Sequence, residues 1–112
     1  MASADELWLV DFGTPSPGEP ADLRPALVIG PPDTFGPLFP FVIVAPLTTT
    51  RRGLSLHVEL DPSPGTGLDE TSYVQCELIR SISRKRLVHP LGIVGPDESH
   101  LVKTVIKTLL DY

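Results

Sequence analysis

Apolar residues recur at alternate positions or in short runs along most of the chain, and only its last part follows a helical period. Runs rich in branched and aromatic side chains, which are typical of strands, cover residues 7–12, 26–29, 42–47, 55–60, 72–82 and 91–94. Segments rich in glycine and proline separate these runs and favour turns. The pattern therefore predicts five or more short strands.

The run at residues 42–47 is the most continuously apolar, so we expect a strand that is buried on both faces. Pro46, near its end, predicts an edge strand or a β-bulge, because proline has no N–H for a central ladder. The residues that follow are polar or positively charged: Thr48, Thr49, Thr50, Arg51 and Arg52. Such a strand delivers hydroxyl groups and positive charge to the surface, an arrangement suited to holding a phosphate.

Residues 55–60 alternate between polar and apolar side chains, and residues 72–82 predict either one further strand or a bent pair of strands. Because successive side chains of a strand point to opposite faces, the first segment should have one solvent-exposed face, which carries Ser55, His57 and Glu59. In the second segment one face carries Tyr73, Gln75 and Glu77. Cys76 falls on the opposite, apolar face, where we expect a small core residue.

The C-terminal segment predicts the one helix. Gly95 suits the N-cap and Pro96 the first helical position, and the acidic pair that follows suits the positive end of the helix dipole. Apolar side chains then recur at helical spacing, at Leu101, Val102, Val105, Ile106, Leu109 and Leu110. We expect this stripe to pack on the strands; pairing of part of it with a second subunit is the alternative.

Short strands and one terminal helix describe a mainly β (α+β) protein, a small, strongly bent antiparallel sheet or barrel. The 112 residues are enough for a single domain, which we expect to span residues 1–112. The N-terminus lacks the pattern of a signal peptide, and no apolar run approaches the ~18 residues that cross a bilayer. Since the single Cys76 also excludes an intramolecular disulfide framework, we expect a cytoplasmic protein.

Charge is distributed unevenly along the chain. Fourteen Asp and Glu residues outnumber nine Lys and Arg residues and give a net charge of −5, whereas nucleic-acid-binding domains are usually basic. The arginines nevertheless gather at residues 51–52 and 80–86, and Arg24 stands alone before the strand predicted at 26–29. Two basic loops on an acidic body are compatible with a phosphate ligand, while solvated surface charge is the simpler interpretation of each arginine alone.

The connection before Arg24, residues 14–23, is rich in proline. Fixed φ angles at Pro15, Pro17 and Pro20 stiffen it. This stiffness predicts either an ordered lid over a site or a plain connection between strands.

The candidate chemistry rests on arginine and threonine. The sequence holds no metal-ligand cluster, no glycine-rich phosphate loop and no Ser-His-Asp arrangement, so we expect no cofactor. Cleavage of RNA needs none, because the substrate's own 2′-hydroxyl is the nucleophile. Arg24 or Arg51 would form bidentate bonds to phosphate oxygens, and residues 48–50 would add hydroxyl donors.

Six segments appear in a distinctive order: ELWLVDF, RPALVI, VIVAPLTTTRRGL, HVEL, GLDETSYVQCELIRSISRKRL, and LG before the final helix. In this order, over nearly the whole length, the chain resembles the MazF/PemK family of toxins from toxin-antitoxin pairs. The resemblance implies an SH3-like barrel with a C-terminal helix, similar to the CcdB toxins, and a homodimer with a cognate antitoxin. It also implies a metal-independent, sequence-specific endoribonuclease that cuts single-stranded RNA to leave a 2′,3′-cyclic phosphate and a 5′-hydroxyl.

The same resemblance implies which residues form the site. The arginine of the family's R-P-x-x-V segment is Arg24, which would serve in proton transfer and phosphate stabilisation, and the threonine after the apolar strand is Thr48, which would donate to the phosphate. These are the two predicted catalytic residues. The predicted substrate-binding residues are Glu19, Thr49, Arg51, Arg52, Gln75 and Glu77. For Glu19 a solvated loop acid is an equal alternative, and we interpret His57 as a residue of the solvent-exposed face rather than a general base.

Two departures from the family pattern remove positive charge. Residues 4–6 are Ala-Asp-Glu in place of Arg-Gly-Glu, and Leu23 stands where a basic residue often precedes the arginine. They imply a different cleavage sequence or weaker activity. An acidic antitoxin segment laid over Arg24 and residues 51–52 fits the charges. The alternative function is a non-enzymatic toxin or binding module of the same fold that acts on a protein partner such as DNA gyrase.

Overall fold

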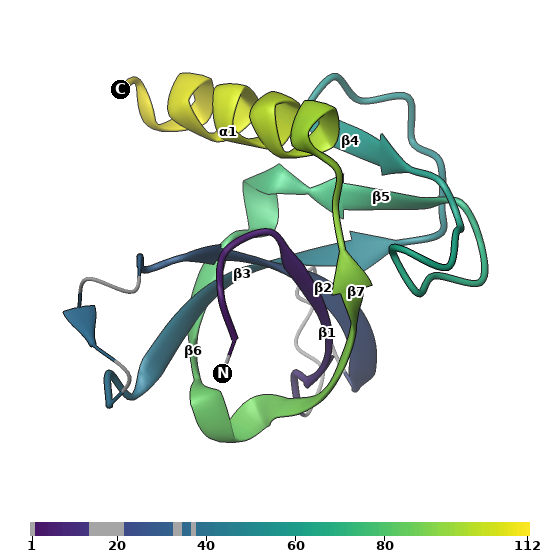
Figure 1. Ribbon diagram of the computed structural model, residues 1–112. Helices are drawn as coiled ribbons and strands as arrows, with labels where there is room; N and C mark the ends of the chain where they lie inside the picture. The colour runs from purple at the N-terminus through teal and green to yellow at the C-terminus, as the bar shows by residue number, and fades with distance from the viewer. Residues whose placement is uncertain (1, 14–21, 33–34, 37) are drawn as a thin grey trace.

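The computed structural model describes residues 2–13, 22–32, 35–36 and 38–112. Over these residues the chain forms a bent sheet followed by a C-terminal helix (Figure 1). The strands are β1 (Glu6–Asp11), β2 (Leu23–Gly30), β3 (Phe41–Thr48), β4 (His57–Leu60), β5 (Ser72–Gln75), β6 (Arg80–Ser83) and β7 (Leu87–Ile93). The helix is α1 (Pro96–Leu110), and two 3-10 turns are η2 (Cys76–Leu78) and η3 (Arg84–Arg86).

The sheet is antiparallel and has seven strands in the order β4-β5-β3-β2-β1-β7, with β6 as a further partner of β3. Figure 1 shows α1 lying above β4 and β5, with the rest of the sheet curled beneath them. This arrangement confirms the predicted class, a mainly β, barrel-like sheet with one C-terminal helix.

Strand β3 has partners on both of its edges. On one edge it pairs with β2; on the other it pairs first with β6, through residues 41–44, and then with β5, through residues 47–48. Pro46 lies opposite Ala26 of β2, at the point where the other edge changes from β6 to β5. The expected edge strand is therefore wrong. Pro46, which has no N–H to donate, is accommodated in this central strand where the pairing changes from β6 to β5.

Buried side chains form two groups, on opposite sides of β2 and β3. One group contains Leu27 and Leu47 and includes Val102 and Ile106 of α1. The other contains Ala26, Val28, Val42 and Val44. The prediction that β3 is buried on both faces holds only for its second half, because Phe41 and Ile43 remain 49% and 37% exposed.

The boundaries of several elements differ from those expected. Strand β4 begins at His57 rather than Ser55, since the His57 N–H donates to the Leu54 carbonyl (3.1 Å) and closes a turn. Residues 72–82 form the bent pair, β5 and β6 joined by η2. Strand β2 begins at Leu23, so that Arg24 lies within the strand.

The helix begins at Pro96 with Gly95 as its N-cap, as predicted. Only part of its apolar stripe packs on the strands: Val102 and Ile106 are buried, whereas Leu101, Leu109 and Leu110 are exposed. None of the described residues belongs to a helix that combines the length and apolar character needed to span a membrane. The predictions of an ordered lid or a plain connection, and of a substrate-binding Glu19, concern residues 14–21, which lie outside the described residues.

The close approach of Gly92 of β7 to residues 65–66 generates a stability prediction. A Cβ on Gly92 would collide with the carbonyl oxygens of Gly65 and Thr66. We expect Gly92→Ala to lower the free energy of unfolding by about 1–3 kcal/mol, the usual cost of overpacking, as measured by urea denaturation. Gly65→Ala is the matched control, since its Cβ would meet only Ser63 Oγ at 3.7 Å. Equal midpoints for the two variants would contradict the prediction.

The buried environment of Cys76 leads to a prediction about its reactivity and about the dependence of stability on pH. Burial of the thiol, helped by the nearby negative charge of Glu77, raises the pKa of Cys76 from 9.0 to about 11. Because the thiolate is the reactive form, a thiol-specific reagent should label Cys76 only after unfolding. Because the folded protein favours the protonated thiol, the contribution of Cys76 to stability is fully present at a pH below the pKa of the unfolded thiol. This contribution is lost as the pH rises through about 11. Cys76→Val should lose less stability than the native chain between pH 9 and 11.

Candidate functional site

The two predicted catalytic residues lie at the ends of neighbouring strands. Arg24 is the second residue of β2 and Thr48 the last of β3. The ladder between the two strands ends at the pair Ala26 and Pro46, and its register, continued by two residues, sets Arg24 opposite Thr48. Opposite residues of antiparallel strands have Cα atoms about 4.5–5.5 Å apart and side chains on one face. The register of β2 and β3 therefore places Arg24 and Thr48 on one face, at the ends of neighbouring strands.

The hydroxyl of Thr48 is oriented by its own loop. Its Oγ1 accepts a hydrogen bond from the Thr50 N–H (3.2 Å), so that the hydroxyl proton remains available to a ligand. Thr49 and Thr50 are exposed loop residues beyond the strand. Of the three threonines, Thr48 is thus the one held by the sheet.

The guanidinium group of Arg24 is half-buried, and its Nε is a buried donor that has no partner among the described residues. A buried donor without a partner costs about 1–3 kcal/mol, and such groups in folded proteins call for an explanation such as a ligand. An anion with two oxygens matches the planar fork of arginine. The Nε of Arg24 is therefore a donor for which the described residues supply no acceptor.

Tyr73 and Glu59 extend this pair into a row across four strands. Tyr73 of β5 lies opposite Thr48 of β3, and Glu59 of β4 lies opposite Tyr73. The four residues Arg24, Thr48, Tyr73 and Glu59 thus share one face of the sheet. The alternation of the sequence placed Tyr73 on a polar face, but it did not show that this face adjoins Thr48.

His57, Gln75 and Glu77 form the next polar group on this side. His57 Nε2 lies 2.8 Å from Glu77 Oε2, and the side chain of His57 is only 2% exposed, so the expectation of a solvent-exposed His57 side chain is wrong. Gln75 lies directly opposite His57 and is 7% exposed. His57 Nδ1 and Gln75 Oε1 are both buried without a partner among the described residues.

A pocket of about 320 Å³ opens beside Tyr73, between the loop after β3 and the polar face of β4 and β5. It is lined by Arg51, Arg52, Gly53, Leu54, Ser55, His57, Glu59 and Tyr73. The exposed arginines at 51–52, which were predicted to bind substrate, therefore lie on the same pocket as Tyr73 and His57, which were not.

The arginines of the second basic segment have structural partners instead. Arg84 donates to the carbonyl oxygens of Phe39 (2.6 Å) and Ala2 (3.5 Å). Arg86 donates to the carbonyl oxygen of Asp11 (3.2 Å), and Arg80 lies over the ring of Phe12, 5.7 Å from its centre. These contacts join η3 and β6 to the N-terminal segment and to the residues before β3. They leave Arg24, Arg51 and Arg52 as the candidates for phosphate binding.

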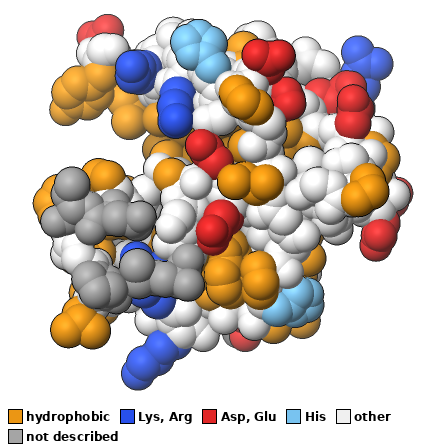
Figure 2. Space-filling view, in the orientation of Figure 1, with side chains coloured by type: hydrophobic (Ala, Val, Ile, Leu, Met, Phe, Trp, Pro, Cys, Tyr) orange, Lys and Arg blue, Asp and Glu red, His pale blue; other side chains and the backbone are white. Residues whose placement is uncertain are grey.

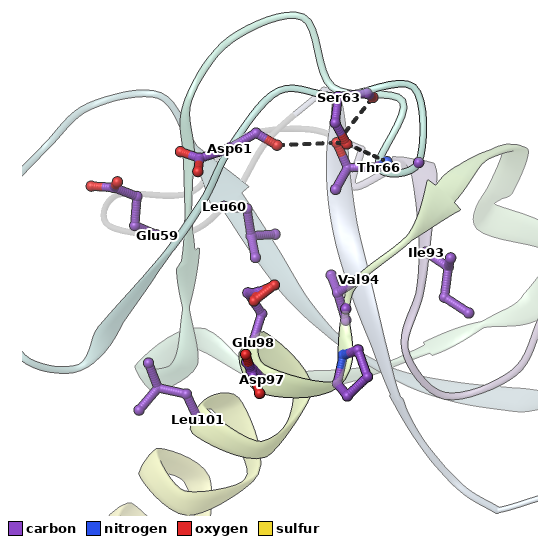
Figure 3. A pocket seen from close by; sticks show the side chains of 13 residues that line it. Glu59, Leu60, Asp61, Ser63, Thr66, Ile93, Val94, Asp97, Glu98 and Leu101 are labelled. Atoms are coloured by element: carbon purple, nitrogen blue, oxygen red, sulfur yellow. Dashed lines mark hydrogen bonds between the residues drawn. The ribbon is translucent and has the colours of Figure 1, made fainter.

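The largest cavity described, about 750 Å³, lies at the start of α1 (Figure 3). Its described lining includes Glu59, Asp61, Asp97 and Glu98 but no lysine or arginine. Figure 2 shows acidic side chains gathered over this part of the surface, above β4 and the start of α1. Such a lining repels phosphate, so size alone does not identify the site.

Within the part of the chain that the structure describes, His, Cys, Asp and Glu side chains form no group of three or more that could hold a metal ion. The described site residues offer arginine and hydroxyl donors together with the acceptor groups of Gln75 and Glu59.

A family of PemK-like, MazF-like toxins of type II toxin-antitoxin systems matches residues 4–110 of the chain. Among solved structures, a Deinococcus radiodurans MazF is 24% identical, covers 99% of this chain and 97% of its own, and has a TM-score of 0.84. The Mycobacterium tuberculosis toxin MazF-mt6 is 24% identical, with coverages of 95% and 96% and a TM-score of 0.77. An endoribonuclease from a mycobacterial species, solved in complex with its cognate antitoxin, is 23% identical, with coverages of 99% and 96% and a TM-score of 0.79.

The unpaired Nε of Arg24 generates a prediction about stability. Arg24→Met keeps the side-chain volume and removes a buried donor, so the free energy of unfolding should stay equal or rise by up to ~1 kcal/mol. Arg84→Met, which removes two hydrogen bonds to carbonyl groups, should lower it by about 1–3 kcal/mol. Thermal unfolding of both variants measures the difference. An equal loss in both would show that Arg24 has a structural partner.

Proposed function

The chain belongs to the PemK-like, MazF-like toxins of type II toxin-antitoxin systems, and from this membership we propose that it is an endoribonuclease that cuts single-stranded RNA. The observation that carries the proposal is the juxtaposition of Arg24 and Thr48 at the ends of β2 and β3. We extend it to a sequence-specific enzyme that works without a metal ion, because the RNA supplies its own nucleophile.

In the proposed reaction the 2′-hydroxyl oxygen attacks the adjacent phosphorus while the bond from phosphorus to the 5′ oxygen breaks. The 2′-hydroxyl loses its proton and the leaving oxygen gains one, which gives a 2′,3′-cyclic phosphate and a 5′-hydroxyl. Arg24 stabilises the charge on the phosphoryl oxygens and takes part in proton transfer, and the Thr48 hydroxyl donates to the same group.

The residues around this pair would hold the flanking nucleotides. Arg51 and Arg52 supply cations beside the pocket next to Tyr73. Gln75 and Glu77 lie further along the same side of the sheet, and Thr49 follows Thr48 in the exposed loop. We assign these five residues to substrate binding.

We further propose that the protein acts in the cytoplasm as a homodimer, and that its antitoxin inhibits it by covering this site. A cognate antitoxin is present in the structure of the mycobacterial endoribonuclease that shares the fold. Carboxylates of an antitoxin segment can occupy the positions of phosphates beside Arg24 and Arg51.

The activity prediction concerns the two catalytic residues. Arg24→Ala and Thr48→Ala should each slow cleavage of a long single-stranded RNA, assayed in EDTA, with a loss of at least ~100-fold for Arg24→Ala, because each removes a preorganised donor to the developing charge. Lys85→Ala, which removes an exposed cation on η3, is the control and should cut at the native rate. Mapping of the 5′ ends identifies the cleavage sequence.

Two outcomes would contradict the proposal. Unchanged cutting by Arg24→Ala would remove that residue from the mechanism. Growth arrest that persists in both variants without RNA fragments would favour a non-enzymatic toxin that acts on a protein partner such as DNA gyrase.

A further inference from the structure

The large cavity at the start of α1 has no part in the proposed cleavage of RNA. It measures about 750 Å³ and lies between β4, the loop at residues 61–66 and the first turn of α1 (Figure 3). Pockets that bind ligands in proteins usually have volumes of about 300–1,000 Å³. The cavity is therefore large enough to receive part of another molecule, and the chemistry of its walls determines which kind.

Apolar side chains form much of these walls. Leu60 and Val94 belong to the core, and Ile93, Pro96 and Leu101 join them on the lining. Ile93 is 56% exposed and Leu101 is 51% exposed. Large apolar side chains that remain exposed together are typical of a surface that binds a partner.

Four carboxylates border the apolar walls, those of Glu59, Asp61, Asp97 and Glu98. The two on α1 also stabilise the positive end of the helix dipole, but Glu59 and Asp61 come from β4 and the loop after it. None of the four takes part in an ion pair between described residues. An apolar cavity with this border complements a ligand that is both cationic and apolar.

A second hollow, of about 510 Å³, adjoins the first. The two share Ile93, Val94 and Pro96, which therefore lie between them. A ligand that enters the first hollow has room to continue across these residues into the second. An extended polypeptide segment fits two adjoining hollows better than a compact small molecule does.

We propose that the cavity docks a segment of a partner protein in which an arginine or lysine adjoins a large apolar residue. The aliphatic stem of the cationic side chain packs on Leu60 and Leu101, and its charged head lies among the carboxylates. The apolar residue packs on Ile93 and Pro96. Arginine suits the role of anchor, since it is enriched among the residues that dominate binding at protein interfaces.

The charges separate this docking surface from the site of Arg24 and Thr48. RNA and an acidic antitoxin segment are both negatively charged, so the four carboxylates disfavour them. Strands β5 and β3 lie between β4 and β2, which sets Arg24 about 14 Å from β4 along the sheet, at about 4.8 Å per strand. The partner therefore leaves the predicted catalytic pair open, and the inference does not depend on the nuclease assignment.

The test is to select peptides from a phage-displayed pool of short random sequences on the purified full chain. The selected peptides should carry arginine or lysine beside a large apolar residue. A labelled synthetic copy should bind at least ~10-fold more weakly to the double variant Asp61→Asn, Asp97→Asn, which removes complementary charge, and to Leu101→Ser, which removes an apolar wall.

Each variant has a matched control. The double variant Asp69→Asn, Glu70→Gln removes the same charge from exposed residues that lie outside the described lining. Leu110→Ser truncates a leucine of the last turn of α1 that is 52% exposed, as Leu101 is 51% exposed. Both controls should bind the peptide as the native chain does.

Amide chemical shifts of the native chain locate the peptide without any variant. Residues 59–61 and 93–101 should shift when the peptide is added, whereas Arg24 and Thr48 should not. Shifts confined to Arg24, Thr48 and their neighbours would overturn the inference.

Three further results would also overturn it. The first is selection of peptides without arginine or lysine, or equal binding by the native chain and the Asp61, Asp97 variant. The second is equal binding of a peptide whose apolar residue is replaced by serine, which would indicate charge attraction alone. The third is self-association of the native chain that Leu101→Ser abolishes in sedimentation, which would show that a second copy covers the cavity. An absence of RNA cleavage would reject only the proposed function, because none of these measurements uses RNA.

Discussion

The pairing of β3 on both of its edges is the constraint on which the rest of the structure depends. Its register with β2 sets Arg24 opposite Thr48, and its register with β5 sets Tyr73 on the other side of the same threonine. A slip of one residue in either pairing would turn these side chains to the opposite face. The two buried groups on either side of β2 and β3 oppose such a slip, because it would move Ala26 and Val28 away from their own group. The hydrophobic core therefore also maintains the geometry of the site.

The arginines of this acidic chain fall into two groups, those with structural partners among the described residues and those without. Arg84 and Arg86 donate to backbone carbonyls and hold the turn after β6 to the N-terminal segment and to the residues before β3. The Nε of Arg24 has no partner among the described residues. Arg51 and Arg52 stand exposed at the pocket beside Tyr73. Net charge is thus a poor guide to ligand chemistry here, because the acidic side chains gather at the start of α1 while the available cations border the row of Arg24, Thr48 and Tyr73.

The sequence predicted the fold class and the helix well, because alternation and helix capping are local properties. Gly95, Pro96 and the stripe with Val102 and Ile106 specify α1 without any knowledge of the sheet. Pro46 misled because its local meaning, an edge or a bulge, depends on which strands adjoin it. His57 misled in the same way: an alternating strand predicts its face, but whether that face is covered depends on residues distant along the chain, such as Glu77, which contacts its ring.

By itself the sequence determined the order of strands and helix, and it singled out Arg24 and Thr48 through a resemblance of whole segments. Their proximity, the burial of His57 and Gln75, and the structural use of Arg84 and Arg86 were decided only by the tertiary structure. The physical reason is that side-chain periodicity is set by the local backbone, whereas strand partners and register follow from the joint burial of residues far apart in the chain. A site built across four strands, from Glu59 to Arg24, therefore depends on strand partners and register and could not be located from local periodicity.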